Sequence, residues 1–328
     1  MRIMGTIARV VFYESDPARN KKAAQTVWRQ FDRLSAACNV YSPASELSRL
    51  QRMAAGGKPV QVSPVLWELF TWSDIAFQQS DNLFDPTARP IIKLWGIYRH
   101  HKDELPSKKE IQEALQYVGW KKLILDRQHK TVSFAIPQLK IDFGGIAKGF
   151  ALDLARRELN KIGIQRGLID LGGNIMVLQQ PPPGRKHYWL GIRNPLKPNS
   201  PSPIITFRAL DCATATSGNY ERFVMIHGKR YGHIINPKTG WPIEGILSAT
   251  VITRKGVVSD FLSTTVYLTK GKTLPQLKKE YPELHALLIF PSPTGNNPDI
   301  RFFPAGDPDF WDFSDLPEGW QVKPMSFF

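Results

Sequence analysis

The chain has 328 residues, of which 42% are hydrophobic and 22% are charged. These values are typical of globular proteins and exclude a mainly disordered, coiled-coil or collagen-like chain. No stretch approaches the ~18 consecutive apolar residues of a membrane-spanning helix, so we expect no membrane span. The first residues show no apolar secretory segment. This predicts a cytoplasmic protein, with an exported protein whose signal has been removed as the alternative.

The 43 basic and 29 acidic residues give a formal net charge of +14. An excess of this size attracts nucleic acid, acidic lipid or phosphorylated ligands in some proteins. Here the basic residues occur in pairs such as Lys21-Lys22 and Lys278-Lys279, without the motif of a nucleic-acid-binding module beside them. We therefore interpret the charge as a basic surface and expect no nucleic-acid partner.

In the first half of the chain, local signals predict one strand and three helices. Residues 7–14 are β-branched and aromatic, which is typical of a strand. Asp16-Pro17 has the form of an N-cap followed by proline at the first helical position. A second helix is predicted from Ser63-Pro64 through Phe77, and a third after the capping box of Ser107 and Glu110.

Further along the chain, strands and helices alternate irregularly. Residues 122–126 and 131–135 predict a hairpin, and a helix over about 147–161 precedes a strand at 167–171. Strands dominate from 186 to 253, a helix begins near Ser259, and a strand covers 286–290.

This irregular order predicts an α+β fold with mixed and antiparallel sheets flanked by helices. No clean linker divides the chain. We expect residues 1–290 to form one domain, with two intertwined lobes as an open alternative, and residues 291–328, rich in Pro, Gly and Asp, to form a C-terminal surface extension.

One segment combines features that suit an anionic ligand. A predicted strand ends at Asp142, Gly144-Gly145 permits a sharp turn, and Lys148 lies in the first turn of the next helix. Backbone N–H groups at a helix N-terminus attract an anion, and Lys148 adds a positive charge. A purely structural strand–turn–helix junction is the alternative.

A second constellation suits a divalent metal. Asp260 and Thr264 are four residues apart at the start of a predicted helix, so their oxygens share one face. A carboxylate and a hydroxyl, completed by a backbone carbonyl and phosphate oxygens, are the hard ligands that Mg²⁺ prefers. Alternatively, Asp260 only stabilises the helix dipole from the first turn.

His233 is the third candidate, in an apolar strand that ends in the turn Asn236-Pro237. It is either a general base or a packed core histidine. Two further segments indicate no particular function when each is taken alone: Phe84-Asp85-Pro86-Thr87 and Met4-Gly5-Thr6.

In chain order, these segments resemble the FAD:protein FMN transferases, the ApbE flavin transferase family, over residues 4–290. The first half of the resemblance is carried by Met4-Gly5-Thr6, Tyr41–Leu50, Phe84–Thr87 and Leu94-Trp95-Gly96. The second half is carried by Asp142–Gly149, Leu171-Gly172-Gly173, Thr216–Arg222, His233–Gly240 and Asp260–Thr264.

The resemblance implies a magnesium-dependent transferase that moves FMN from FAD to a threonine of an acceptor flavoprotein and releases AMP. It implies that His233 is the catalytic base. It places FAD on Met4, Tyr41, Leu83, Phe84, Asp85, Asp142, Lys148 and Ile234. It places Mg²⁺ on Asp260, Thr264 and the carbonyl of Gly145, with Ser263 as an additional oxygen.

Three positions depart from the family pattern. Asn174 and Asn236 stand where aspartate is usual, and Gly232 stands where many members have a second histidine. Two alternative functions stay open at this point. One is an FAD pyrophosphatase that gives FMN and AMP, and the other is a non-catalytic basic protein that binds flavin or nucleic acid.

Overall fold

The structure, a computed structural model, describes residues 1–97, 104–292 and 297–327. It divides into two compact units, each assembled from separate stretches of chain. Unit 1 comprises Met1–Phe31, Lys148–Tyr220 and Glu244–Phe328, and unit 2 comprises Asp32–Ala147 and Glu221–Ile243. Helix α1 (Pro17–Cys38) runs from the first unit into the second.

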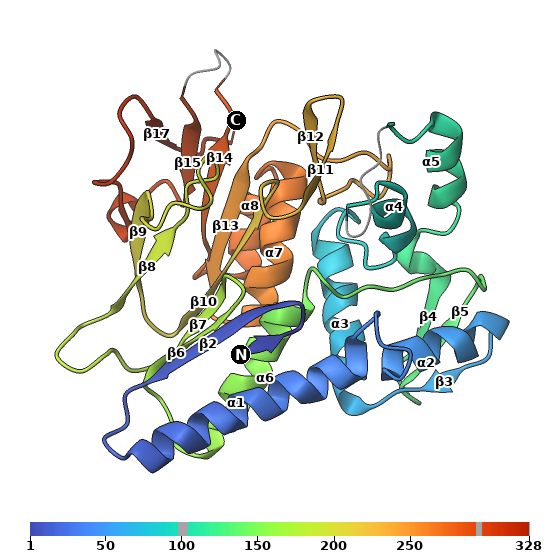
Figure 1. The fold of residues 1–328 in the computed structure, drawn as a ribbon, viewed down its shortest axis with the longest axis horizontal. Helices are drawn as coiled ribbons and strands as arrows, with labels where there is room; N and C mark the ends of the chain where they lie inside the picture. The colour runs from blue at the N-terminus through green and yellow to red at the C-terminus, as the bar shows by residue number, and fades with distance from the viewer. Residues whose placement is uncertain (98–103, 293–296, 328) are drawn as a thin grey trace. The chain divides into compact units, whose positions relative to one another are not determined.

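A mixed sheet organises unit 1 (Figure 1). In the described part of the chain it contains nine strands, in the order β1-β2-β6-β7-β10-β13-β14-β15-β17. All neighbours are antiparallel except β15 and β17, which are parallel. The strands are β1 (Arg2–Ile3), β2 (Thr6–Phe12), β6 (Gly167–Leu171), β7 (Asn174–Val177), β10 (Cys212–Gly218), β13 (Ser248–Thr253), β14 (His285–Phe290), β15 (Asp299–Phe303) and β17 (Gln321–Pro324).

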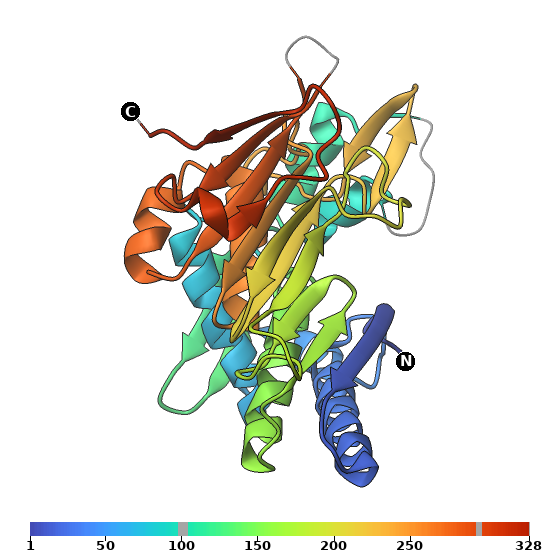
Figure 2. The same cartoon turned by 90° about the vertical axis from the view of Figure 1, so that its left-hand side faces the viewer.

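Each face of this sheet is covered differently (Figure 2). A small sheet of β8 (Tyr188–Ile192), β9 (Ile205–Ala209) and β16 (Trp311–Asp312) packs on one face, where Leu190 and Phe207 share a buried core with Ile252 and Leu287. Helix α7 (Gly256–Thr269) packs along β10 and β13. Because side chains alternate along a strand, Ser217 of β10 points to α7 while Thr216 bonds Thr250 on the other face. Also in unit 1 are α6 (Ala147–Lys161, which begins in unit 2), α8 (Leu274–Glu280) and the short helix η3 (Pro308–Phe310).

Unit 2 is mainly helical and has its own core. The indole Nε1 of Trp95 donates to the carbonyl of Gly240 at 2.8 Å, and Trp95 packs with Ile91, Val224 and Tyr231. A three-stranded sheet has the order β3-β5-β4, and β11 pairs with β12. The elements are α2 (Glu46–Met53), η1 (Ala54–Gly56), β3 (Val60–Gln61), α3 (Pro64–Gln79), α4 (Arg89–Leu94), α5 (Lys108–Leu115), η2 (Trp120–Lys122), β4 (Leu123–Asp126), β5 (Thr131–Phe134), β11 (Phe223–Ile226) and β12 (Lys229–Gly232).

Elements with strong local signals form where they are predicted. Helix α1 begins at Pro17, and α3 begins at Pro64 with Ser63 as its N-cap. Both hydrogen bonds of the Ser107–Glu110 capping box are present. The hairpin β4–β5, helix α6 and strand β6 also lie at the predicted places, so the predicted α+β class with mixed and antiparallel sheets is confirmed.

The predicted start of α7 is wrong by three residues. The helix begins at Gly256 because a residue distant in sequence caps it: the Asp153 carboxylate of α6 accepts the N–H groups of Gly256 and Val257, each at 2.8 Å. The N-cap residue itself, Lys255, makes no side-chain cap bond. Asp260 therefore lies in the second turn and not in the first, which removes the reading of Asp260 as a first-turn dipole partner.

The placement of His233 in a strand is also wrong, because β12 ends at Gly232 and His233 occupies the bend that follows.

Residues beyond 290 contribute β15 and β17 to the large sheet, and Ile300 is fully buried there. The division at residue 290 stays a prediction. No helix in the described ranges has the length and apolar character needed to cross a membrane.

Candidate active site

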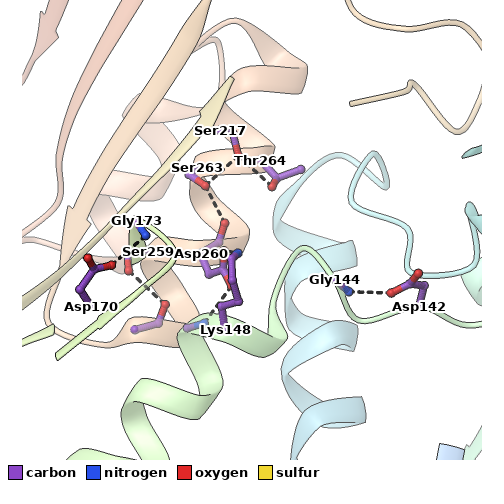
Figure 3. A network of polar contacts seen from close by, with 12 residues as sticks. Asp142, Gly144, Lys148, Asp170, Gly173, Ser217, Ser259, Asp260, Ser263 and Thr264 are labelled. Atoms are coloured by element: carbon purple, nitrogen blue, oxygen red, sulfur yellow. Dashed lines mark hydrogen bonds and ion pairs between the residues drawn. The ribbon is translucent and has the colours of Figure 1, made fainter. Parts of the chain in front are cut away.

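The first group of site residues lies in unit 1, where α6 meets α7 (Figure 3). The Nζ atom of Lys148 is 3.4 Å from Oδ1 of Asp260, and the other carboxylate oxygen accepts the N–H of Gly149 at 2.8 Å. The Asp260 side chain is 5% exposed and that of Lys148 is 27% exposed. A nearly buried negative charge is thus paired with a partly exposed cation. Two residues that the resemblance assigns to different ligands interact directly.

Three hydroxyl groups lie beside this pair, two on the next turn of α7 and one on β10. Ser217 Oγ of β10 is 2.9 Å from Ser263 Oγ and 3.2 Å from Thr264 Oγ1. Ser263 Oγ also donates to the Asp260 carbonyl at 2.8 Å. Ser217 joins the predicted residues in space because β10 lies against α7, although it is far from them in sequence.

The close packing of α6 on α7 depends on two glycines. A Cβ atom at Gly149 would overlap the Gly256 carbonyl oxygen and lie 2.6 Å from Cβ of Asp260. A Cβ atom at Gly256 would in turn overlap the Gly149 carbonyl. Without these side chains the two backbones approach closely enough for the Gly149 N–H to reach Asp260. Together with the Asp153 cap, this contact positions the carboxylate.

The second group of site residues lies in unit 2, around the loop that carries Asp142. Its backbone N–H donates to the Pro86 carbonyl at 2.8 Å, and its Oδ1 accepts the Gly144 N–H at 2.9 Å. Burial raises the pKa of the Asp142 carboxyl group, and the Gly144 hydrogen bond opposes this shift. The positive charges of Arg89 and Arg222 also act to lower this pKa.

Asp85 stabilises a neighbouring turn through hydrogen bonds to its carboxylate. Its Oδ1 accepts both the N–H and the hydroxyl of Thr87, at 2.8 and 2.6 Å, and its Oδ2 accepts the Trp120 N–H at 3.0 Å. Burial raises the pKa of this carboxyl group, while the bonds from Thr87 and Trp120 lower it. Both carboxylate oxygens therefore hold the fold of this loop, which also presents the buried Phe84.

His233 is held in a defined tautomer. Its backbone N–H and its Nδ1 both lie 3.0 Å from the Arg222 carbonyl. An imidazole nitrogen bonded to a carbonyl must carry the proton, so Nε2 is the basic nitrogen of the neutral ring. This is the arrangement that a general base requires.

The remaining predicted residues occupy different surroundings. Met4 of unit 1 has a positive φ of 50° in the β1–β2 turn, a conformation that is strained for a residue with a side chain. In unit 2, Tyr41 is 53% exposed, whereas Ile234 is buried. Leu83 donates its N–H to the Ser80 carbonyl at 3.0 Å, and Gly145 lies in the turn before α6.

The structure thus brings together Lys148, Asp260, Ser263 and Thr264 in unit 1. The predicted residues that belong to unit 2 are Tyr41, Leu83, Phe84, Asp85, Asp142, Gly145, His233 and Ile234. The sequence prediction missed Ser217, Gly149 and Asp153 as supporting residues. The Thr216-Ser217-Gly218 segment was the available signal for Ser217, whereas no local pattern marks Asp153.

The oxygen atoms around Asp260 fit a hard divalent cation. The described residues contain no group of three His, Cys, Asp or Glu side chains that could hold a metal. One buried carboxylate with neighbouring hydroxyl oxygens nevertheless matches the sparse protein ligation of Mg²⁺, which usually completes its shell with water and phosphate oxygens.

Comparison with known proteins gives consistent results. A family model described as the ApbE family matches residues 4–288. An FAD:protein FMN transferase of Chlamydia muridarum is 31% identical over 281 residues, 83% of this chain and 85% of the relative. The FAD:protein FMN transferase of Treponema pallidum is 29% identical over 303 residues, 88% of this chain and 83% of the relative.

Solved structures show the same fold. The ApbE protein of Thermotoga maritima superimposes with a TM-score of 0.77 at 27% identity, covering 88% of this chain and 93% of that one. The flavin transferase ApbE of Vibrio cholerae gives a TM-score of 0.79 at 24% identity, covering 92% and 94%. The relatives are named as transferases, and the motifs of the resemblance lie within the matched range. This chain belongs to the ApbE family.

Proposed function

We propose that the protein transfers FMN from FAD to a threonine of an acceptor flavoprotein, with Mg²⁺ as cofactor and AMP as the second product. The observation that carries the proposal is the match of residues 4–288 to a family whose relatives are named FAD:protein FMN transferase. The polar cluster around Asp260 supports it, because cleavage of a pyrophosphate requires oxygen ligands and positive charge at one place.

The reaction balances as a phosphoryl-type substitution. The threonine oxygen forms a bond to the phosphorus of the FMN half, and the bond from that phosphorus to the bridging oxygen breaks. The electron pair leaves with AMP, and the hydroxyl proton goes to the base. Water in place of threonine would give free FMN and AMP.

Mg²⁺ would be held by Asp260, Thr264, Ser263 and the Gly145 carbonyl, and it would neutralise charge that develops on the pyrophosphate oxygens. Lys148 supplies a further positive charge that neutralises these oxygens. Because the Asp260 carboxylate already holds its Nζ, the ammonium group is placed at the edge of the oxygen cluster before any substrate arrives. Such preorganised charge costs no rearrangement during the reaction.

His233 takes the threonine proton in this proposal. A threonine hydroxyl is a weak nucleophile at neutral pH, and a positioned base contributes about 10²–10⁴-fold in rate. The bond from Nδ1 to the Arg222 carbonyl supports this role, since it orients the ring and makes Nε2 the basic nitrogen of the neutral ring.

Product analysis tests the proposal. The protein is incubated with FAD, Mg²⁺ and a purified candidate acceptor flavoprotein, and a matched acceptor has valine in place of the target threonine. We expect one AMP to be released for each flavin that becomes attached to the acceptor. The attached flavin is detected as fluorescence of the acceptor band on a denaturing gel, and the band of the valine acceptor should not fluoresce. Free FMN without labelled acceptor would identify a pyrophosphatase, and FAD binding without AMP would identify a binding protein.

A further inference from the structure

Unit 2 contains a basic groove that none of the assigned residues lines. It has a volume of about 460 Å³, which is within the ~300–1,000 Å³ of ordinary ligand sites. Helices α2 and α4 form its walls, together with the chain just before Asp142. The lining residues are Ser48, Gln51, Arg52, Arg89, Pro90, Lys93, Tyr117, Gln138 and Lys140.

The described residues that line this groove carry charge of one sign. They include four cations, Arg52, Arg89, Lys93 and Lys140, and none of them is Asp or Glu. Within the described ranges, none of these four cations takes part in an ion pair. Arg52 donates to a backbone carbonyl, that of Pro43, at 3.1 Å. A concave surface lined by one sign of charge concentrates the field and attracts the opposite charge.

The groove adjoins the flavin residues predicted in unit 2. The Arg89 guanidinium lies 5.5 Å from the centroid of the exposed Tyr41 ring. The buried Gln51 accepts the Ile141 N–H through its Oε1 at 3.0 Å. This hydrogen bond links a residue that lines the groove to the backbone next to Asp142. A segment bound in the groove would therefore lie next to residues that the resemblance assigns to FAD.

We propose that this basic groove binds an acidic segment of the acceptor protein. The proposal rests on the proposed function, which requires a protein acceptor beside bound FAD. Four cations in a groove whose described lining residues include no Asp or Glu match a short run of Asp or Glu side chains, and Tyr117, 37% exposed, adds a surface for packing. A nucleic acid is disfavoured because Tyr117 is the one aromatic side chain among the described lining residues, whereas single strands require several stacking surfaces.

The test uses the full-length protein and two fluorescein-labelled peptides. Both contain one threonine, and they differ in having four aspartates or four asparagines around it. Binding is followed by fluorescence anisotropy without FAD. The charge-reversal variant is Arg52→Glu/Lys93→Glu, on α2 and α4. The control is Lys58→Glu/Lys121→Glu, which changes the net charge equally at exposed positions of unit 2 outside the groove.

We expect the aspartate peptide to bind the wild-type protein about tenfold more tightly than the asparagine peptide, because several exposed charge pairs act together. The groove variant should lose this preference and the control should keep it. Salt at about 1 M, where the Debye length is about 3 Å, should abolish it. FAD affinity should be the same in all three proteins.

Four results would overturn the proposal. These are no preference of the wild type for the acidic peptide, an equal loss in the control, a parallel loss of FAD affinity in the groove variant, and tighter binding of an oligothymidylate than of the peptide. The flavin-transfer assay is scored separately. Peptide binding with no transfer to any acceptor would count against the proposed function and leave the groove assignment in place.

Discussion

Replacing Gly149 with alanine should separate α6 from α7 and disturb the Asp260 carboxylate. The new Cβ would overlap the Gly256 carbonyl oxygen and lie 2.6 Å from the Cβ of Asp260. Both contacts involve atoms close to or within the backbone, so no side chain can rotate away. The helices must move apart, and the 2.8 Å bond from the Gly149 N–H to Asp260 is then stretched or lost.

The size of the effect follows from three contributions. Overpacking a tight contact costs about 1–3 kcal/mol, and a weakened hydrogen bond to a buried carboxylate costs about 1.5–3 kcal/mol. Alanine gains about 1 kcal/mol over glycine in a helix. We therefore expect the free energy of unfolding to fall by about 1.5–5 kcal/mol in Gly149→Ala, the sum of these ranges.

Urea denaturation measures the stability, and the transfer assay with increasing Mg²⁺ measures the site. The matched control is Gly56→Ala, because a Cβ there meets nothing within 4 Å and its φ is not positive. This control should be neutral or slightly more stable. If Gly149→Ala unfolded at the wild-type urea concentration and kept its Mg²⁺ response, the α6–α7 contact would not position Asp260.

Three further variants test single residues. Burial raises the pKa of Asp153 to about 6, so the folded state gains a proton as the pH falls through that value. The stability of the wild type relative to Asp153→Asn should therefore rise by at most about 3 kcal/mol from about pH 7.5 to 4.5, and a constant difference in urea titrations would contradict this. Asp260→Asn should remove Mg²⁺-dependent turnover and cost about 1–3 kcal/mol, because the side chain is buried and bonded; full activity would refute the metal assignment. His233→Gln should lower the transfer rate by about 10²–10⁴-fold with unchanged FAD affinity, whereas an active enzyme with a lower Tm would make His233 a packing residue.

The stability effect expected for Asp260 differs from what the sequence suggests. A residue in the first exposed turn of a helix can usually be replaced with little loss of stability. Asp260 instead lies in the second turn, is buried, and accepts bonds from two residues of α6. Loss of activity in a variant at this position must therefore be compared with its unfolding curve.

Several features of this protein could be predicted from the sequence because their causes are local. Pro17 and the Ser107–Glu110 pair mark helix starts through backbone geometry and capping bonds within four residues. The β4–β5 hairpin follows from two short apolar runs with a turn between them. The ordered motifs were also sufficient to identify the family, since six or more segments at the right spacing rarely coincide.

The tertiary structure decided what depends on contacts between distant residues. The start of α7 was missed because its cap, Asp153, precedes it by about a hundred residues. The Asp260–Gly149 bond spans 111 residues, and Ser217 reaches Ser263 only because the alternation of β10 turns it toward α7. Local propensity carries no information on such pairings, since they arise from the way in which the sheet and helices bury their apolar faces against each other.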